Sequence, residues 1–76
     1  MSIYAVVYGE KHHQITYHDQ LNLAIAELGQ KHYAYMIGES DFDPHIVHLV
    51  LREHKYIQHG NIVTMDTLEA FLHQNQ

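Results

Sequence analysis

The chain has 76 residues, with four Lys or Arg against nine Asp or Glu and nine His, and its formal net charge is −5 at pH 7 with histidine neutral. A chain of this length forms one domain, residues 1–76, and the absence of cysteine excludes disulfides, cysteine-based metal sites and thiol nucleophiles. The acidic balance argues against a surface that follows nucleic-acid phosphates, and the apolar run at residues 3–8 is too short to span a bilayer. We therefore expect a small soluble cytoplasmic domain without a membrane segment.

The first part of the chain predicts a hairpin and then a helix. Residues 2–8 are β-branched and aromatic, and residues 14–17 alternate polar and apolar as a return strand does. Asp19 is a residue type that caps helices at the N-terminus, and Gly29 stands where a C-terminal cap is expected. The apolar stripe of this predicted helix has helical spacing and consists of Leu21, Ala24, Ile25 and Leu28.

The middle of the chain predicts a third strand and a second helix. Residues 31–37 are rich in Tyr and end in Ile, and Gly38 closes this predicted strand. Asp43 followed by Pro44 is typical of a helix N-cap and first helical position, which predicts a helix from residue 44 to about residue 55. The competing interpretation is a strand through residues 46–51, because Val and Ile dominate that run.

The last part predicts a short strand at residues 62–64 and a final helix. Asp66 with Glu69 three residues later is a capping-box pattern, and the apolar residues that follow it have helical spacing. The expected fold is therefore α+β, in the approximate order ββαβαβα, with a mostly antiparallel sheet and the helices on one face.

Motifs of autonomous catalysis are missing from the sequence. The glycines are isolated, so no phosphate-binding loop is present. The segment around Ser40 lacks the second glycine of a nucleophile elbow, and a loop serine before two aspartates is typical of a turn. We expect a protein that is not an enzyme and that holds no cofactor.

Histidine is the strongest anomaly of the composition, and it raises a metal-binding hypothesis. On the predicted second helix His45 and His48 are three residues apart and share a face, with Asp41 and Asp43 one loop away. Imidazole and carboxylate groups that converge in this way bind transition metals. Against this, no HExxH motif is present and the nine histidines are scattered through the chain.

Tyrosine is concentrated in the predicted strands and indicates a contact surface. Alternation along the first strand puts Tyr4, Val6 and Tyr8 on one face and Ile3, Ala5 and Val7 on the other, so both faces are apolar. If helices cover one face, the face with the tyrosines needs a partner. The predicted interface residues are Tyr4, Val6, Tyr8, Tyr17, Tyr33 and Tyr35.

These patterns favour a non-enzymatic protein-interaction or regulatory domain that self-associates, with a homodimer as the expected form. One alternative is a histidine-based transition-metal-binding protein. A second is a winged-helix-like regulator associated with nucleic acid, or an acidic inhibitor of a nucleic-acid-binding partner, although the few basic residues argue against direct phosphate contact.

Overall fold

The central strand of the sheet, β1 (Ser2–Tyr8), pairs with a neighbour on each side. In the computed structural model, which describes residues 1–74, the sheet has the strand order β2-β1-β3-β4 and every pairing is antiparallel. The other elements are β2 (Gln14–His18), α1 (Leu21–Met36), β3 (His45–Arg52), β4 (Lys55–Gln58) and α2 (Leu68–Gln74).

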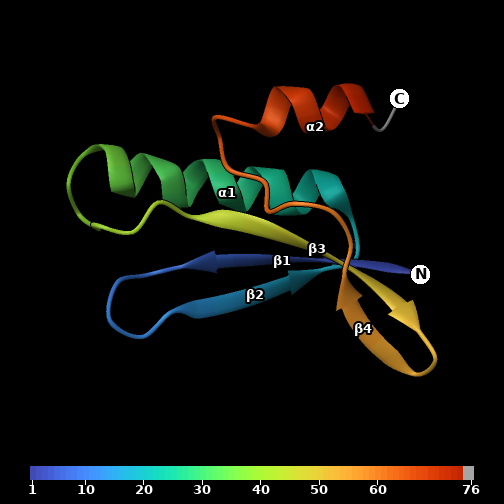
Figure 1. Cartoon of the computed structure of the whole chain (residues 1–76). Helices are drawn as coiled ribbons and strands as arrows, with labels where there is room; N and C mark the ends of the chain where they lie inside the picture. Colours follow the sequence, from blue (N-terminus) through green and yellow to red (C-terminus); the bar gives the residue numbers. More distant parts are fainter. Residues whose placement is uncertain (75–76) are drawn as a thin grey trace.

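Both helices lie on the same side of the sheet (Figure 1). The core forms between the sheet and this helical layer, and its fully or nearly fully buried members come from both strands and helix. They are Val6, Ala24, Leu28, Ile46 and Val63. The α+β class, the mostly antiparallel sheet and the placement of helices on one face are thus as predicted, while the observed order is ββαββα.

The predicted third strand at residues 31–37 is wrong, because α1 continues to Met36. Lys31 follows the apolar stripe, and its Nζ atom lies 4.1 Å from the ring centroid of Tyr8, so a cation–π contact joins this turn of the helix to β1. Gly29 is therefore inside the helix and does not cap it. The chain leaves the helix at Gly38, which has a φ of 83° and donates its backbone N–H to the carbonyl of Tyr35.

The N-terminus of α1 also differs from the prediction. Gln20 occupies the N-cap position in place of Asp19, and it makes no side-chain capping hydrogen bond. Instead, the side chain of His18 at the end of β2 contacts Glu27 of α1 across 2.7 Å, and both side chains are largely buried. This hydrogen bond holds α1 against the hairpin.

The predicted helix from residue 44 to about residue 55 is wrong. The segment forms strand β3, as the competing strand interpretation predicted. Pro44 is buried and precedes the strand, a position where its missing N–H removes no hydrogen bond of the ladder. β3 pairs with β1 over six positions, from Ser2 opposite Val50 to Val7 opposite His45, and three of the six β3 residues are β-branched. Long-range pairing thus outweighs the local Asp-Pro signal.

The segment after β4 returns across the helical side and ends in α2. The predicted short strand at residues 62–64 is reduced to one bridge, in which Val63 pairs with Ile46. The entry to α2 is organised by Thr64 and Thr67: the Thr64 N–H donates to Oγ1 of Thr67 across 2.9 Å. Oγ1 of Thr67 also donates to the carbonyl of Thr64, so among residues 1–74 the threonine hydroxyl, and not the carboxylate of Asp66, organises the turn that the capping-box pattern suggested.

None of the helices in the described range, residues 1–74, is both long enough and apolar enough to cross a membrane.

Candidate functional site

The side of the sheet opposite the helices is an apolar surface, which we call the open face. Cross-strand partners share a face, so the register groups Val7 of β1 with Ile15 of β2, and Ala5 with both Tyr17 and Val47. No described helix covers this side of the sheet (Figure 1). The apolar residues of the open face are Ile3, Ala5, Val7, Ile15, Tyr17, Val47, Leu49, Leu51 and Tyr56.

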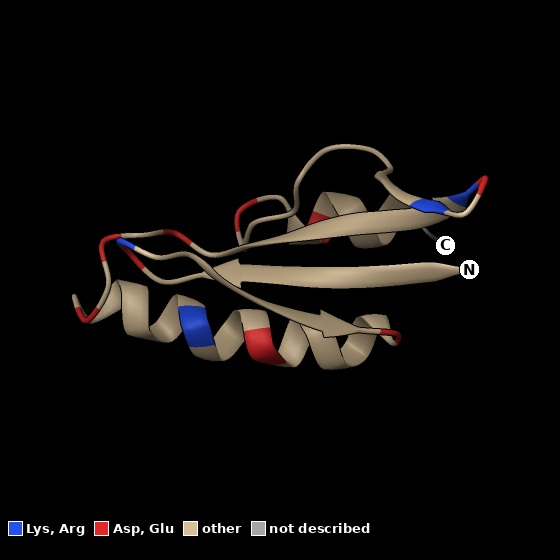
Figure 2. Cartoon of the chain, turned by 90° about the horizontal axis from the view of Figure 1, so that it is seen from below, with Lys and Arg blue, Asp and Glu red and all other residues tan. Residues whose placement is uncertain are grey.

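The open face carries no formal charge. Figure 2 shows that Lys, Arg, Asp and Glu residues lie in the loops, on the helices and around the β3–β4 turn, while the bodies of the strands carry none. The two polar positions that the register adds to the open face are His45 and Gln58. A nearly continuous apolar sheet surface without charge is what a packed interface requires, and it is uncommon on a solvated one.

The structure corrects the expectation that Tyr4, Val6 and Tyr8 form the exposed face. Val6 has no exposed surface, and both tyrosines pack against the core cluster. Tyr4 stacks on His48 with the ring centroids 4.8 Å apart. The sequence contained the right signal, since both faces of β1 are apolar, but the alternation could not tell which face the helices cover.

The other three predicted interface tyrosines lie in different places. Tyr17 belongs to the open face and is 61% exposed. Tyr33 and Tyr35 belong to α1, where Tyr33 is 66% exposed and Tyr35 is half-buried beside His32. The six tyrosine and valine positions therefore do not form one surface, and only Tyr17 remains a candidate contact residue of the open face.

The predicted metal ligands are not brought together. In a strand, residues three apart point to opposite faces, so His45 lies on the open-face side of β3 and His48 on the helical side. Asp41 is exposed in the α1–β3 loop, and Oδ1 of Asp43 is buried without a hydrogen-bond partner. Within residues 1–74 no group of three or more His, Cys, Asp or Glu side chains could hold a metal ion.

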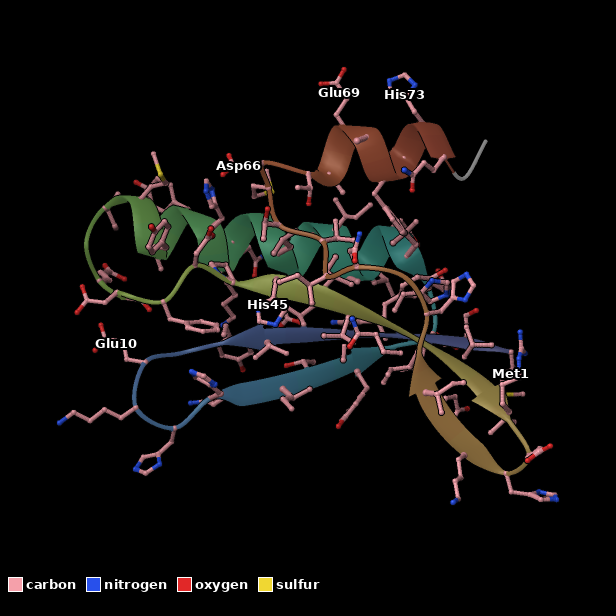
Figure 3. All side chains as sticks on the ribbon, in the orientation of Figure 1. Met1, Glu10, His45, Asp66, Glu69 and His73 are labelled. Carbon is pink, nitrogen blue, oxygen red and sulfur yellow. The ribbon has the colours of Figure 1, made fainter. Side chains whose placement is uncertain are left out.

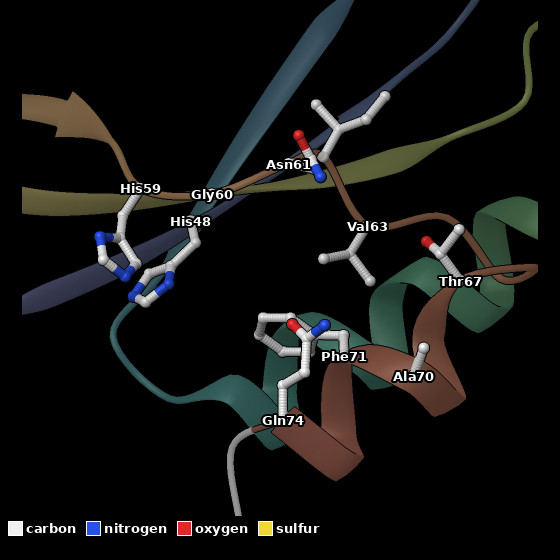
Figure 4. A pocket seen from close by; sticks show the side chains of 10 residues that line it. His48, His59, Gly60, Asn61, Val63, Thr67, Ala70, Phe71 and Gln74 are labelled. Atoms are coloured by element: carbon white, nitrogen blue, oxygen red, sulfur yellow. The ribbon is translucent and has the colours of Figure 1, made fainter.

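A pocket of about 410 Å³ lies between α2 and the segment that follows β4. Its apolar wall includes Phe71 of α2, and the rings of His48 and His59 stand beside each other at one end (Figure 4). The centroids of these two imidazoles are 5.4 Å apart, and the rings meet edge to face. Residues on the outer side of α2, such as Glu69 and His73, point away from this pocket and from the sheet (Figure 3).

The environment of the strand histidines favours their neutral form. Burial lowers the pKa of His48, and the neighbouring His59 lowers it further because two positive imidazoles would repel each other. Burial also lowers the pKa of His45; nearby His13 adds to the decrease, while the backbone and carboxylate of Asp43 oppose it. Both imidazoles are thus suited to packing in a sheet, where an uncompensated charge would be costly.

The closest arrangement to a catalytic pair is Ser2 with His48. Oγ of Ser2 and Nε2 of His48 are 3.1 Å apart and share a hydrogen bond. The same imidazole also contacts the rings of Tyr4 and His59, and within residues 1–74 it has no hydrogen bond to a carboxylate that would orient a general base. The second serine, Ser40, accepts a hydrogen bond from the backbone N–H of Phe42 and serves the loop turn.

Comparisons of the chain with protein-family models, with curated proteins and with solved structures found no match.

Proposed function

We propose that the protein is a non-enzymatic protein-interaction domain and that its contact surface is the open face of the sheet. The observation that carries the proposal is the uncharged apolar surface on the side without helices. A polypeptide that covers this surface would remove exposed side chains such as Ile15 and Tyr17 from water. The proposal keeps the interaction function expected from the sequence but moves it to the opposite face of β1.

The size of the open face supports this function. With strands spaced about 4.8 Å apart and a rise of about 3.3 Å per residue, the four strands of seven, five, eight and four residues have a flat footprint of roughly 380 Å². Apolar patches of about 300–600 Å² on soluble proteins often mark interaction sites. An uncharged face of this size fits an apolar, uncharged partner surface better than a nucleic acid.

The test compares two tyrosines of similar exposure on opposite sides of the molecule. A photoreactive phenylalanine analogue is placed at position 17, on the open face, or at position 33, on α1, where the native side chains are 61% and 66% exposed. After irradiation of purified protein and of producing cells, we expect one discrete adduct from position 17 and none above background from position 33. Equal adduct patterns from the two positions would contradict an interaction surface on the open face.

A further inference from the structure

The outer edge of β2 is unprotected against pairing with another strand. β2 is the end of the sheet, so one side of its backbone hydrogen-bonds to β1, while the other side has no neighbouring strand from residues 1–74. Natural edge strands are usually blocked by charged side chains, by proline or by short length. The sequence of β2, Gln-Ile-Thr-Tyr-His, contains neither a Lys, Arg, Asp or Glu residue nor a proline.

The opposite edge of the sheet has the protection that β2 lacks. β4 has only four residues and begins with Lys55, β3 ends at Arg52, and the turn between these two strands contains Glu53. The β3–β4 hairpin also bends away from the rest of the sheet (Figure 1). The contrast between the two edges indicates that β2 is the edge available for pairing.

The residues of β2 are complementary to themselves in an antiparallel arrangement centred on Thr16. In that register Thr16 faces Thr16 of the second copy, and Ile15 faces Tyr17 in both directions. Pairs of threonines and pairs of an aromatic with a β-branched residue are among the favourable cross-strand neighbours in antiparallel sheets. Just outside the strand, the same register places Asp19 opposite His13, so an acid meets an imidazole and not a second acid.

We infer that a second copy of this chain pairs its β2 with β2 antiparallel about a two-fold axis at Thr16. The two four-stranded sheets then form one continuous sheet, and both open faces lie on the same side of it. The inference rests on the proposed function, because Ile15 and Tyr17 of the open face stand at the seam. It names the second copy as the partner that extends this surface.

The helices leave room for this arrangement. The buried α1 residues Ala24 and Leu28 pack with Val6 of β1, so the packed side of α1 lies over β1, and α1 also contacts β2 where Glu27 lies 2.7 Å from His18. The two β1 strands of the dimer would be three strand spacings apart, roughly 14 Å. Helices in direct contact pack about 8–10 Å apart, so the two α1 helices do not collide.

The test uses charge on the two-fold axis. In a dimer centred on Thr16, each Thr16→Lys or Thr16→Glu chain places two like charges opposite each other. We expect native mass spectrometry to show a dimer of the unaltered chain and self-association at least roughly tenfold weaker for either variant. Mixing the two variants restores a dimer of one Lys chain and one Glu chain, because opposite charges then face each other.

The matched control is Ile57→Lys, which adds the same charge at the other edge, to a side chain that is 50% exposed. This variant is expected to dimerise like the unaltered chain.

A monomeric unaltered chain, a Thr16→Lys variant that dimerises normally, or a mixture that forms no heterodimer would each overturn the β2 pairing. A monomeric chain that still gives a position-17 adduct with another protein overturns only the β2 pairing, whereas equal adducts at positions 17 and 33 overturn the proposed function.

Circular dichroism establishes whether the position-16 variants fold. If they do not fold, the β2 pairing is tested on the unaltered chain, by comparing its amide hydrogen exchange at high and at low protein concentration. Pairing through β2 makes the outward amides of residues 14–18 exchange more slowly at high concentration, whereas those of β4 do not change. Concentration-independent exchange of the β2 amides would overturn the inference.

Discussion

At the scale of single residues, His48 combines three contacts that depend on its protonation state. It stacks on Tyr4, shares a hydrogen bond with Ser2 and meets the edge of His59. Burial and the neighbouring His59 both lower its pKa below the ordinary value of 6.5. The unfolded chain therefore binds a proton at a higher pH than the folded chain does, and the same direction holds for His45.

This difference in pKa predicts a loss of stability in acid. The contribution of His48 is fully present above the unfolded value of 6.5 and is lost as the pH falls from there through the lower folded-state pKa. We expect His48→Gln to lose less free energy of unfolding than the unaltered chain between about pH 7 and about pH 5, measured by urea denaturation. His12→Gln, at an exposed loop position, serves as the control, and an acid loss in His48→Gln equal to that of the unaltered chain would refute the prediction.

At the scale of elements, α1 contains a glycine that its conformation does not require. Gly29 is inside the helix, and a Cβ atom added to it would meet no heavy atom within 4 Å. Gly38 has equally open surroundings, but its φ of 83° lies in the left-handed region that side chains disfavour. The two glycines therefore differ in backbone conformation and not in available space.

This pair of glycines gives opposite expectations for the same substitution. Gly29→Ala is expected to stabilise the domain by about 0.5–1 kcal/mol, because alanine loses less backbone entropy in a helix. Gly38→Ala is expected to destabilise it by about 1 kcal/mol, because a left-handed residue with a Cβ is strained. Thermal unfolding of the two variants measures both effects. A lower melting temperature for Gly29→Ala would show that a Cβ atom is not tolerated at position 29.

The elements also show where local patterns stop being informative. The hairpin of β1 and β2 and the first half of α1 were predictable, because β1 is β-branched and aromatic, β2 alternates polar and apolar residues, and the helical spacing is unbroken up to Leu28. The end of α1 was not, because Lys31 interrupts the apolar stripe in the sequence while its Nζ atom contacts the ring of Tyr8 in the folded domain. The Asp43-Pro44 pair before β3 predicted a helix, whereas the valines within β3 predicted a strand. Only the pairing of β3 with β1 decided between the two.

At the scale of the whole molecule, the domain has a small core, and its stability depends on a few large side chains. Tyr4 and Tyr8 cover this core on the helical side of the sheet, whereas Tyr17 projects from the open face. A domain of about this size buries only about 60% of the surface that its unfolded chain exposes, so losses at the core have large effects.

Substitutions at these tyrosines therefore distinguish residues that stabilise the fold from a residue proposed to serve association. Replacing Tyr4 and Tyr8 together with serine is expected to reduce the free energy of unfolding by more than about 3 kcal/mol, enough to unfold a marginal domain. Tyr17→Ser is expected to change it by less than about 0.5–1 kcal/mol, because the side chain is already solvated in the monomer. Circular dichroism during urea denaturation gives both values, and a folded double variant would contradict the assignment of Tyr4 and Tyr8 to the core.

The sequence alone determined the α+β class, the hairpin at the start, the apolar stripe in the first half of α1 and the lack of thiol chemistry. These properties follow from composition and from side-chain periodicity, which act over a few neighbouring residues. Only the tertiary structure decided that β3 is a strand, that α1 runs to Met36, and that Tyr4, Val6 and Tyr8 face the helices while Ile15 and Tyr17 do not. The physical reason is that β1 and β3 are apolar on both faces, so which face is buried depends on where α1 packs, and periodicity within a strand is the same for either choice.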